Sequence, residues 1–230
     1  MSTNAPEEAP MAQMAEPQRL AAVAALGDPV RKALFRLVQT SAEPLGREDC
    51  AAALGLPRST ALAQLDRLVD AGLLEVEFRK LGPRTGPGSG RPAKLYRAAV
   101  AEVAASVPER HYDLAAVLLA RAVERSIATG GPVADALGEV AFAAGVELGE
   151  REGSMAAVLD ATGYAPQDDG DGGYVLANCP FHRLARDHTE VVCSLNGALL
   201  AGALAGCADA GLQVVPDPGG AFCCARIERT

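Results

Sequence analysis

Apolar residues recur every three or four positions along much of the first hundred residues, which is the spacing of helices with one buried face. The pattern predicts helices beginning near Arg19, from Val30 to Gln39, from Arg47 to Leu54 and from Arg58 to Ala71. The last two are separated only by Gly55-Leu56-Pro57. A short helix, a tight turn containing glycine and a longer helix together predict a helix-turn-helix.

Two stretches after this helix pair, Leu73–Arg79 and Ala93–Ala98, predict short strands. The loop between them is rich in glycine and proline, and residues 79–97 hold six Lys and Arg but no Asp or Glu. A glycine-rich hairpin tip with this charge is suited to following phosphates or entering a minor groove. The pattern therefore predicts a winged helix-turn-helix DNA-binding domain over residues 18–100.

The following residues predict two long helices, Glu109–Thr129 and Val133–Glu152, with small residues on both. Two helices cannot enclose a core alone, so they must pack on a neighbouring domain or on a second copy of the chain. Helix-turn-helix proteins commonly dimerise because their DNA half-sites repeat with twofold symmetry. We therefore expect a homodimer, with residues 101–165 as a helical dimerisation segment.

The last part of the chain, residues 166–230, predicts a small α+β domain. A helix is expected from Thr189 to Gly206, with strands at Tyr174–Ala177, Leu212–Val215 and Phe222–Glu228. The whole chain is thus expected to be mainly α with small β. Residues 1–17 are poor in branched apolar residues and hold three prolines, which predicts a disordered tail.

Charge divides the chain in a way that the net value of −8 hides. Residues 19–97 carry a net +5 and the remainder −13. A basic module joined to an acidic one is typical of a nucleic-acid binder with a regulatory domain, so the expected partner is double-stranded DNA. A signal peptide and a membrane span are not expected, because no basic n-region precedes an apolar run and no stretch approaches eighteen consecutive apolar residues. The predicted location is the cytoplasm, where thiols stay reduced.

Five of the six cysteines and two of the three histidines lie between Asn178 and Ile227. Such a density of thiols indicates a soft metal or an iron–sulfur cluster. Cys207 ranks low because fourteen helical residues, about 21 Å, separate it from Cys193. Adjacent residues of a strand point to opposite faces, so only one of the last two cysteines is expected to bind. The expected ligands are Cys179, Cys193 and Cys223, with the fourth position open to His182, Cys224, a partner's residue or an exogenous molecule.

The kind of centre follows less directly from spacing. Zinc sites usually contain close Cys-x-x-Cys pairs, which this chain lacks, whereas three widely spaced thiolates suit an iron–sulfur cluster, expected to be 4Fe-4S. Zinc, metal-free thiol redox sensing and purely structural cysteines are the alternatives. Cys193, near a helix start, is expected to be a favoured thiolate. A thiol enzyme with Cys193 as nucleophile and His182 or His188 as base is disfavoured, because no oxyanion-hole glycine motif is present.

Four motifs in the first hundred residues resemble those of bacterial winged-helix repressors of the ArsR/DeoR-like type. They are Leu-Gly-Asp-Pro-Val-Arg at 26–31, Leu-Pro-Arg-Ser-Thr at 56–60, Leu-Xaa-Xaa-Leu-Val-Xaa-Ala-Gly-Leu-Leu at 65–74 and Gly-Arg-Pro-Ala-Lys-Leu-Tyr at 90–96. The resemblance implies a recognition helix whose exposed start reads DNA. The DNA-binding residues so expected are Arg58, Ser59, Thr60 and Gln64, with Arg91 and Lys94 in the wing beside Arg84 of the charged loop.

The C-terminal part resembles SufR-like repressors of iron–sulfur assembly, which combine an Asn-Cys-Pro-aromatic-His start with a cysteine about thirteen residues on and another near the end. Here the start is at 178–182, the second cysteine at 193 and the last at 223 or 224. The resemblance implies a repressor whose DNA affinity responds to iron or redox state through a cluster. A zinc-binding winged-helix regulator and a protein-interaction scaffold remain competing interpretations.

Overall fold

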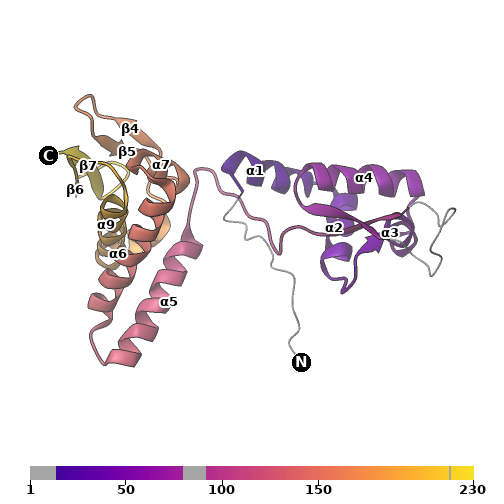
Figure 1. The fold of residues 1–230 in the computed structure, drawn as a ribbon, viewed down its shortest axis with the longest axis horizontal. Helices are drawn as coiled ribbons and strands as arrows, with labels where there is room; N and C mark the ends of the chain where they lie inside the picture. Colours follow the sequence, from indigo (N-terminus) through magenta and orange to yellow (C-terminus); the bar gives the residue numbers. More distant parts are fainter. Residues whose placement is uncertain (1–13, 80–91, 218) are drawn as a thin grey trace. The chain divides into compact units, whose positions relative to one another are not determined.

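The computed structural model describes residues 14–79, 92–217 and 219–230. It is mainly helical, and the chain divides into two units, residues 1–105 and 106–230, each with its own hydrophobic core (Figure 1). The segments predicted as a separate dimerisation region and cysteine domain share the second core. They form one unit because the two long helices of the first segment have no core until the long apolar helix of the second covers them.

The first unit is a helix-turn-helix followed by a small antiparallel sheet. Asp28 caps the second helix by accepting hydrogen bonds from the backbone N–H groups of Val30 and Arg31. Gly55 ends the third helix with a φ of 62°, a left-handed conformation that glycine adopts without strain. The elements are α1 (Glu16–Ala25), α2 (Pro29–Gln39), β1 (Leu45–Gly46), α3 (Arg47–Leu54), α4 (Arg58–Asp70), β2 (Leu74–Arg79) and β3 (Ala93–Ala98).

Two details of this unit differ from the sequence expectation. Helix α1 begins at Glu16, within the stretch predicted to be disordered, and residues 1–13 of that stretch lie outside the described residues. Strand β1 was not predicted, because two residues carry no periodic signal. It pairs with β3, Leu45 opposite Tyr96, and gives the sheet the order β1-β3-β2.

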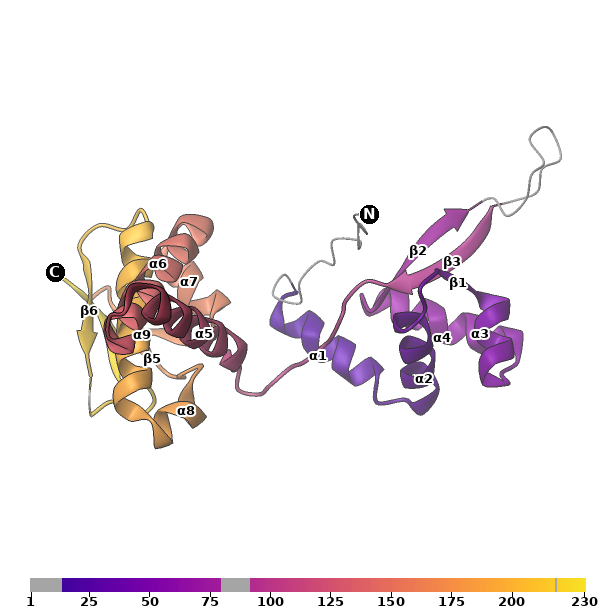
Figure 2. The same ribbon diagram turned by 90° about the horizontal axis from the view of Figure 1, so that it is seen from below.

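The second unit contains three long helices and a four-stranded antiparallel sheet of order β4-β5-β7-β6, against which the last of these helices packs (Figure 2). The short elements β4 and α8 were not predicted, and the last strand begins three residues later than expected. The elements are α5 (Tyr112–Thr129), α6 (Val133–Glu152), α7 (Met155–Ala161), β4 (Pro166–Asp168), β5 (Tyr174–Leu176), α8 (His182–Asp187), α9 (Thr189–Gly206), β6 (Leu212–Pro216) and β7 (Ala225–Arg229).

Helices α6 and α9 approach each other backbone to backbone. A Cβ atom added to Gly145 of α6 would lie 2.1 Å from the Leu199 carbonyl oxygen, and one added to Gly202 of α9 would lie 2.0 Å from the Phe142 carbonyl oxygen. Only glycine permits so close an approach. This contact fixes the position of α9, which carries Cys193.

Helix α9 is long and apolar enough, by length and composition alone, to cross a membrane. One such helix is weak evidence of a membrane span, and Leu195, Leu199 and Leu200 of α9 are buried in the core of the unit. Its apolar composition is therefore accounted for by its packing.

Candidate functional site

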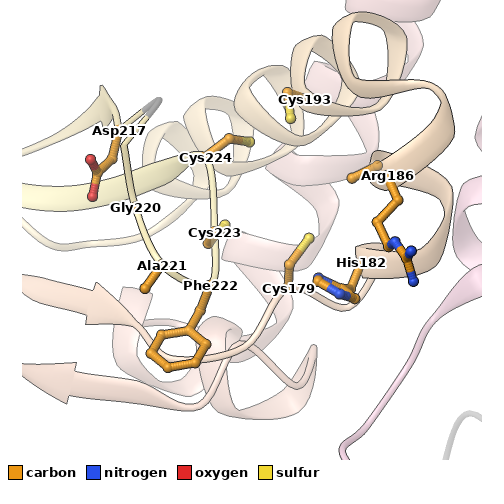
Figure 3. A pocket seen from close by; sticks show the side chains of 11 residues that line it. Cys179, His182, Arg186, Cys193, Asp217, Gly220, Ala221, Phe222, Cys223 and Cys224 are labelled. Carbon is orange, nitrogen blue, oxygen red and sulfur yellow. The ribbon is translucent and has the colours of Figure 1, made fainter.

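Four of the six cysteines gather around one pocket in the second unit. Cys179 follows strand β5, Cys193 lies on α9, and Cys223 and Cys224 precede β7. Together with His182 they line a pocket of about 200 Å³ (Figure 3). Three segments that are distant in the sequence thus bring their sulfurs to one place.

Both members of the Cys223-Cys224 pair face this pocket, contrary to the prediction from strand alternation. The prediction was wrong because β7 begins at Ala225, so the two cysteines lie in a loop that has no alternating faces. The amide nitrogen Nδ2 of Asn196 lies 3.6 Å from Cys223 Sγ and 3.7 Å from Cys224 Sγ. The side chains are therefore held on the same side of the loop.

Each thiol interacts with the next one around the pocket, and these interactions shift the pKa values of the thiols in different directions. The pKa of Cys179 is lowered, because the Cys223 thiol and then the Phe181 backbone N–H donate hydrogen bonds to it. The pKa of Cys223 is raised to about 11, chiefly by this interaction with Cys179. That of Cys224 is also raised, first by Cys223 and then by burial. Of these three cysteines, Cys179 is the one whose thiolate is stabilised by its neighbours.

Cys193 does not behave as its place near a helix start predicted. Burial, followed by its interaction with Cys224, raises its pKa to about 12. Cys193 is the fifth residue of α9, so its thiol lies beyond the first helical turn. The free N–H groups that would stabilise a thiolate belong to that first turn. Desolvation is therefore the largest influence on the pKa of this thiol.

The other candidate residues fall into two groups. His182 begins α8 and lines the pocket, and its backbone N–H donates to the Cys179 carbonyl at 3.1 Å. Cys207 lies at the far end of α9 and is not among the pocket residues. Cys50 is fully buried in the core of the first unit, and burial raises its pKa to about 11.

The loop that carries Cys179 is bonded to the segment with which the second unit begins. Arg110 donates to the Asn178 side-chain oxygen and, at 3.2 Å, to the Cys179 carbonyl. Asn178 donates in turn to the Glu109 carbonyl at 3.0 Å, and the His111 backbone N–H donates to the Pro180 carbonyl at 3.2 Å. Residues 109–111 and 178–180 are thereby held together through both side chains and backbone.

The donor atoms around the pocket do not form a site for a single ion. Across residues 14–79, 92–217 and 219–230, no three His, Cys, Asp or Glu side chains are grouped closely enough to hold one metal ion. A tetrahedral zinc ion with Zn–S bonds of about 2.3 Å holds its sulfurs only about 3.8 Å apart. Closing these thiols onto one zinc would require movement of the segments that carry them.

The predicted DNA-contacting residues lie on α4 and β3. Arg58 and Ser59 are exposed at the start of α4, with Thr60 half-buried beside them, and Arg58 pairs with Glu48 of α3 at 3.1 Å. An exposed pair of this kind is weak, so a phosphate can displace Glu48. Arg84 and Arg91 lie outside the described residues.

Two of these residues are held by intramolecular partners. Gln64 accepts a hydrogen bond from Arg31 at 3.1 Å. Lys94 pairs with Asp66 of α4 at 2.7 Å and lies 5.1 Å from the centre of the Tyr96 ring. The Lys94–Asp66 ion pair connects β3, at the base of the wing, to the recognition helix α4.

Asn196 and Tyr164 are the site residues that sequence reasoning missed. The available signal for Asn196 was an amide side chain one helical turn after Cys193, in a mostly apolar helix. The phenol could not be found in this way, because it lies thirty-two residues from Asn196 and meets it only in the folded unit.

The comparisons with known proteins concern the first unit. Residues 26–77 match a family described as a helix-turn-helix domain, a range that runs from just before α2 into β2. No curated protein matches the chain. The winged helix-turn-helix arrangement and this match define the protein as a DNA-binding transcription regulator.

Proposed function

We propose that the protein is a cytoplasmic, homodimeric transcriptional repressor whose DNA affinity is controlled by an iron–sulfur cluster held in the second unit. The observation that supports it best is the gathering of Cys179, Cys193, Cys223 and Cys224 around one pocket. Thiolates are the usual ligands of such clusters. A cubane cluster also suits sulfurs that do not converge on one point, because each cysteine binds a different iron.

The proposed ligands are Cys179, Cys193 and Cys223, with Cys224 as the fourth. Cys224 is favoured over His182 because it interacts with both Cys223 and Cys193 and lies within reach of the Asn196 amide. When bound, the cluster supplies a centre that responds to electrons, oxidants and iron supply. The chain's own residues supply the thiolates, the burial and the hydrogen bonds around it.

The bonds between residues 109–111 and 178–180 offer a route from this site to the DNA-binding unit. The polypeptide enters the second unit at Ser106, and the side chain of Arg110 then bonds to the loop of Cys179. Loss of a cluster ligand at Cys179 would free this loop and, with it, the start of the unit. The spacing of the two recognition helices in a dimer would then change.

A second copy of the chain is the proposed partner of α5. Ala116, Ala120, Val123 and Ile127 recur at helical spacing on its exposed side, and Ile127 is 79% exposed. In light-scattering measurements, Ile127→Glu should shift the molecular mass from dimer towards monomer. Ala128→Glu, a neighbouring exposed alanine, is the control that should leave the mass unchanged.

Anaerobic purification tests the cluster directly. The wild-type protein should be brown, with visible absorption and stoichiometric iron and sulfide, and Cys179→Ser should lose all three. Cys207→Ser should keep them, because Cys207 does not line the pocket. Colourless wild-type protein with stoichiometric zinc would instead favour a zinc-dependent regulator, and colourless metal-free protein a thiol redox sensor.

Coupling to DNA is tested by comparing operator affinity with and without the cluster. The two affinities should differ in the wild type, and Arg110→Ala should bring them closer together while preserving visible absorption. Arg125→Ala, which removes an exposed arginine paired with Glu139, is the matched control and should leave the difference intact. Equal affinities in the wild type would refute cluster control.

A further inference from the structure

Asn196 is a polar residue in the apolar interior of the second unit. Its side chain is 1% exposed on α9, between Leu195 and the buried leucines of the next turn. Burying an amide without hydrogen-bond partners raises the free energy of the folded state, so the contacts of this amide indicate its role. Its oxygen Oδ1 accepts a hydrogen bond of 2.5 Å from the hydroxyl of Tyr164, and its nitrogen Nδ2 faces the sulfurs of Cys223 and Cys224.

The Tyr164 contact fixes which end of the amide faces the sulfurs. Tyr164 is itself only 1% exposed, and burial raises the pKa of its phenol well above the usual value, so the hydroxyl keeps its proton. A hydroxyl that donates to Oδ1 turns the NH₂ group towards the cysteine pair. The two buried polar groups therefore form one chain, from phenol to amide to sulfur.

Neutral thiols are poor acceptors for such a donor. The two sulfurs are 3.6 and 3.7 Å from Nδ2, and a thiol accepts hydrogen bonds only weakly. A thiolate accepts far more strongly, because hydrogen bonds to a charged acceptor are about twice as strong. A buried amide facing two adjacent cysteines is thus better matched to sulfurs that carry negative charge than to protonated ones.

We propose that Asn196, oriented by Tyr164, is a positioning residue that donates its amide N–H groups to the thiolate ligands at Cys223 and Cys224. This inference rests on the proposed cluster. Donation to ligand sulfur withdraws negative charge, and it stabilises the reduced cluster more than the oxidised one because the reduced state is more negative. Asn196 therefore raises the reduction potential and slows loss of the cluster.

Three variants test this role. Asn196→Leu has a similar volume and no donor, Asn196→Asp replaces the donor by a carboxylate, and Tyr164→Phe leaves the amide in place but unoriented. The reduction potential, followed by visible absorption in a mediated redox titration, should fall in all three. Cluster loss to a chelator should accelerate, by about tenfold or more for the two Asn196 variants. Thr162→Val, a buried hydroxyl outside the pocket, is the control expected to change neither property.

The outcomes separate this inference from the proposed function. A wild-type protein without a cluster refutes both. A wild-type cluster whose potential and loss rate are unchanged in Asn196→Leu refutes the role of Asn196 alone. If Asn196→Leu fails to fold by far-UV circular dichroism, Tyr164→Phe decides: a lower potential supports the inference and an unchanged one overturns it.

Discussion

The contact between α6 and α9 should be sensitive to a single methyl group at Gly202. A Cβ atom there would lie 2.0 Å from the carbonyl oxygen of Phe142 and 2.8 Å from its carbonyl carbon. Ordinary contacts between such atoms are about 3.5 Å or longer. The obstacle is the backbone of α6 and cannot rotate away, so Gly202→Ala must push the two helices apart.

Two opposing effects set the size of the change. Alanine in place of glycine within a helix favours folding by up to about 1 kcal/mol. Overpacking a core typically costs about 1–3 kcal/mol, and more where the obstacle cannot move. Because the clash is with backbone and separates an entire helix pair, we expect the second effect to dominate. The net loss in free energy of unfolding should be about 2 kcal/mol or more.

Urea unfolding of the metal-free protein, followed by far-UV circular dichroism, measures this loss. The transition of the second unit should move to lower urea, while that of the first unit should stay in place. Gly197→Ala on α9 and Gly138→Ala on α6 are matched controls, since a Cβ at either position meets nothing within 4 Å. They should be neutral or stabilising by up to about 1 kcal/mol. Equal stability of Gly202→Ala and Gly197→Ala would refute the reasoning.

Three further results are expected. Arg58→Ala should weaken operator binding in fluorescence anisotropy and reduce the slope of log affinity against log salt by about 0.9 if one phosphate contact is lost. Asn178→Ala should lower the free energy of unfolding of the second unit by about 2 kcal/mol in urea, because buried carbonyl partners at Gly163 and Glu109 lose their donor. The Arg31 and Val30 N–H groups lower the pKa of Asp28. Its cap should therefore stabilise α2 above the ordinary pKa of 3.8 and be lost as pH falls through the lower folded value, an acid dependence that Asp28→Asn should weaken in circular dichroism.

The parts of the fold that were predictable are those with a repeated local signal. Helices α3, α6 and α9 begin and end at the predicted residues, since each has an apolar period and a glycine or proline near an end. Strand β3 was also placed correctly, at Ala93–Ala98. Such elements carry their signal within a short stretch of the chain, so the sequence alone locates them.

The errors occur where the structure depends on contacts between distant residues. Helix α8 has six residues, too few for a period to be recognised. The apolar run Phe222-Cys223-Cys224-Ala225 suggested a strand, but in the folded unit its cysteines turn into the pocket before pairing with β6 begins at Ala225. The density of thiols predicted Cys179, Cys193 and Cys223 as ligands of one centre; all three line the same pocket, and their role as ligands stays a prediction. The buried pair Tyr164–Asn196 could not be predicted, because no local pattern joins a residue of the loop before β4 to a residue of α9.

The position of the pocket explains how a small chemical change can affect a whole unit. Its sulfurs come from the loop after β5, from α9 and from the loop before β7, so a group bound to all of them would add a further link between α9 and two loops of the sheet. Binding energy gained in this way is also folding energy of the joined elements. The loop of Cys179 is bonded to neighbouring segments through the side chains of Asn178 and Arg110. These side chains also hold residues 109–110, at the start of the second unit. Residues 109–110, which follow the DNA-binding unit in the chain, are therefore bonded directly to the loop that a change at Cys179 would alter.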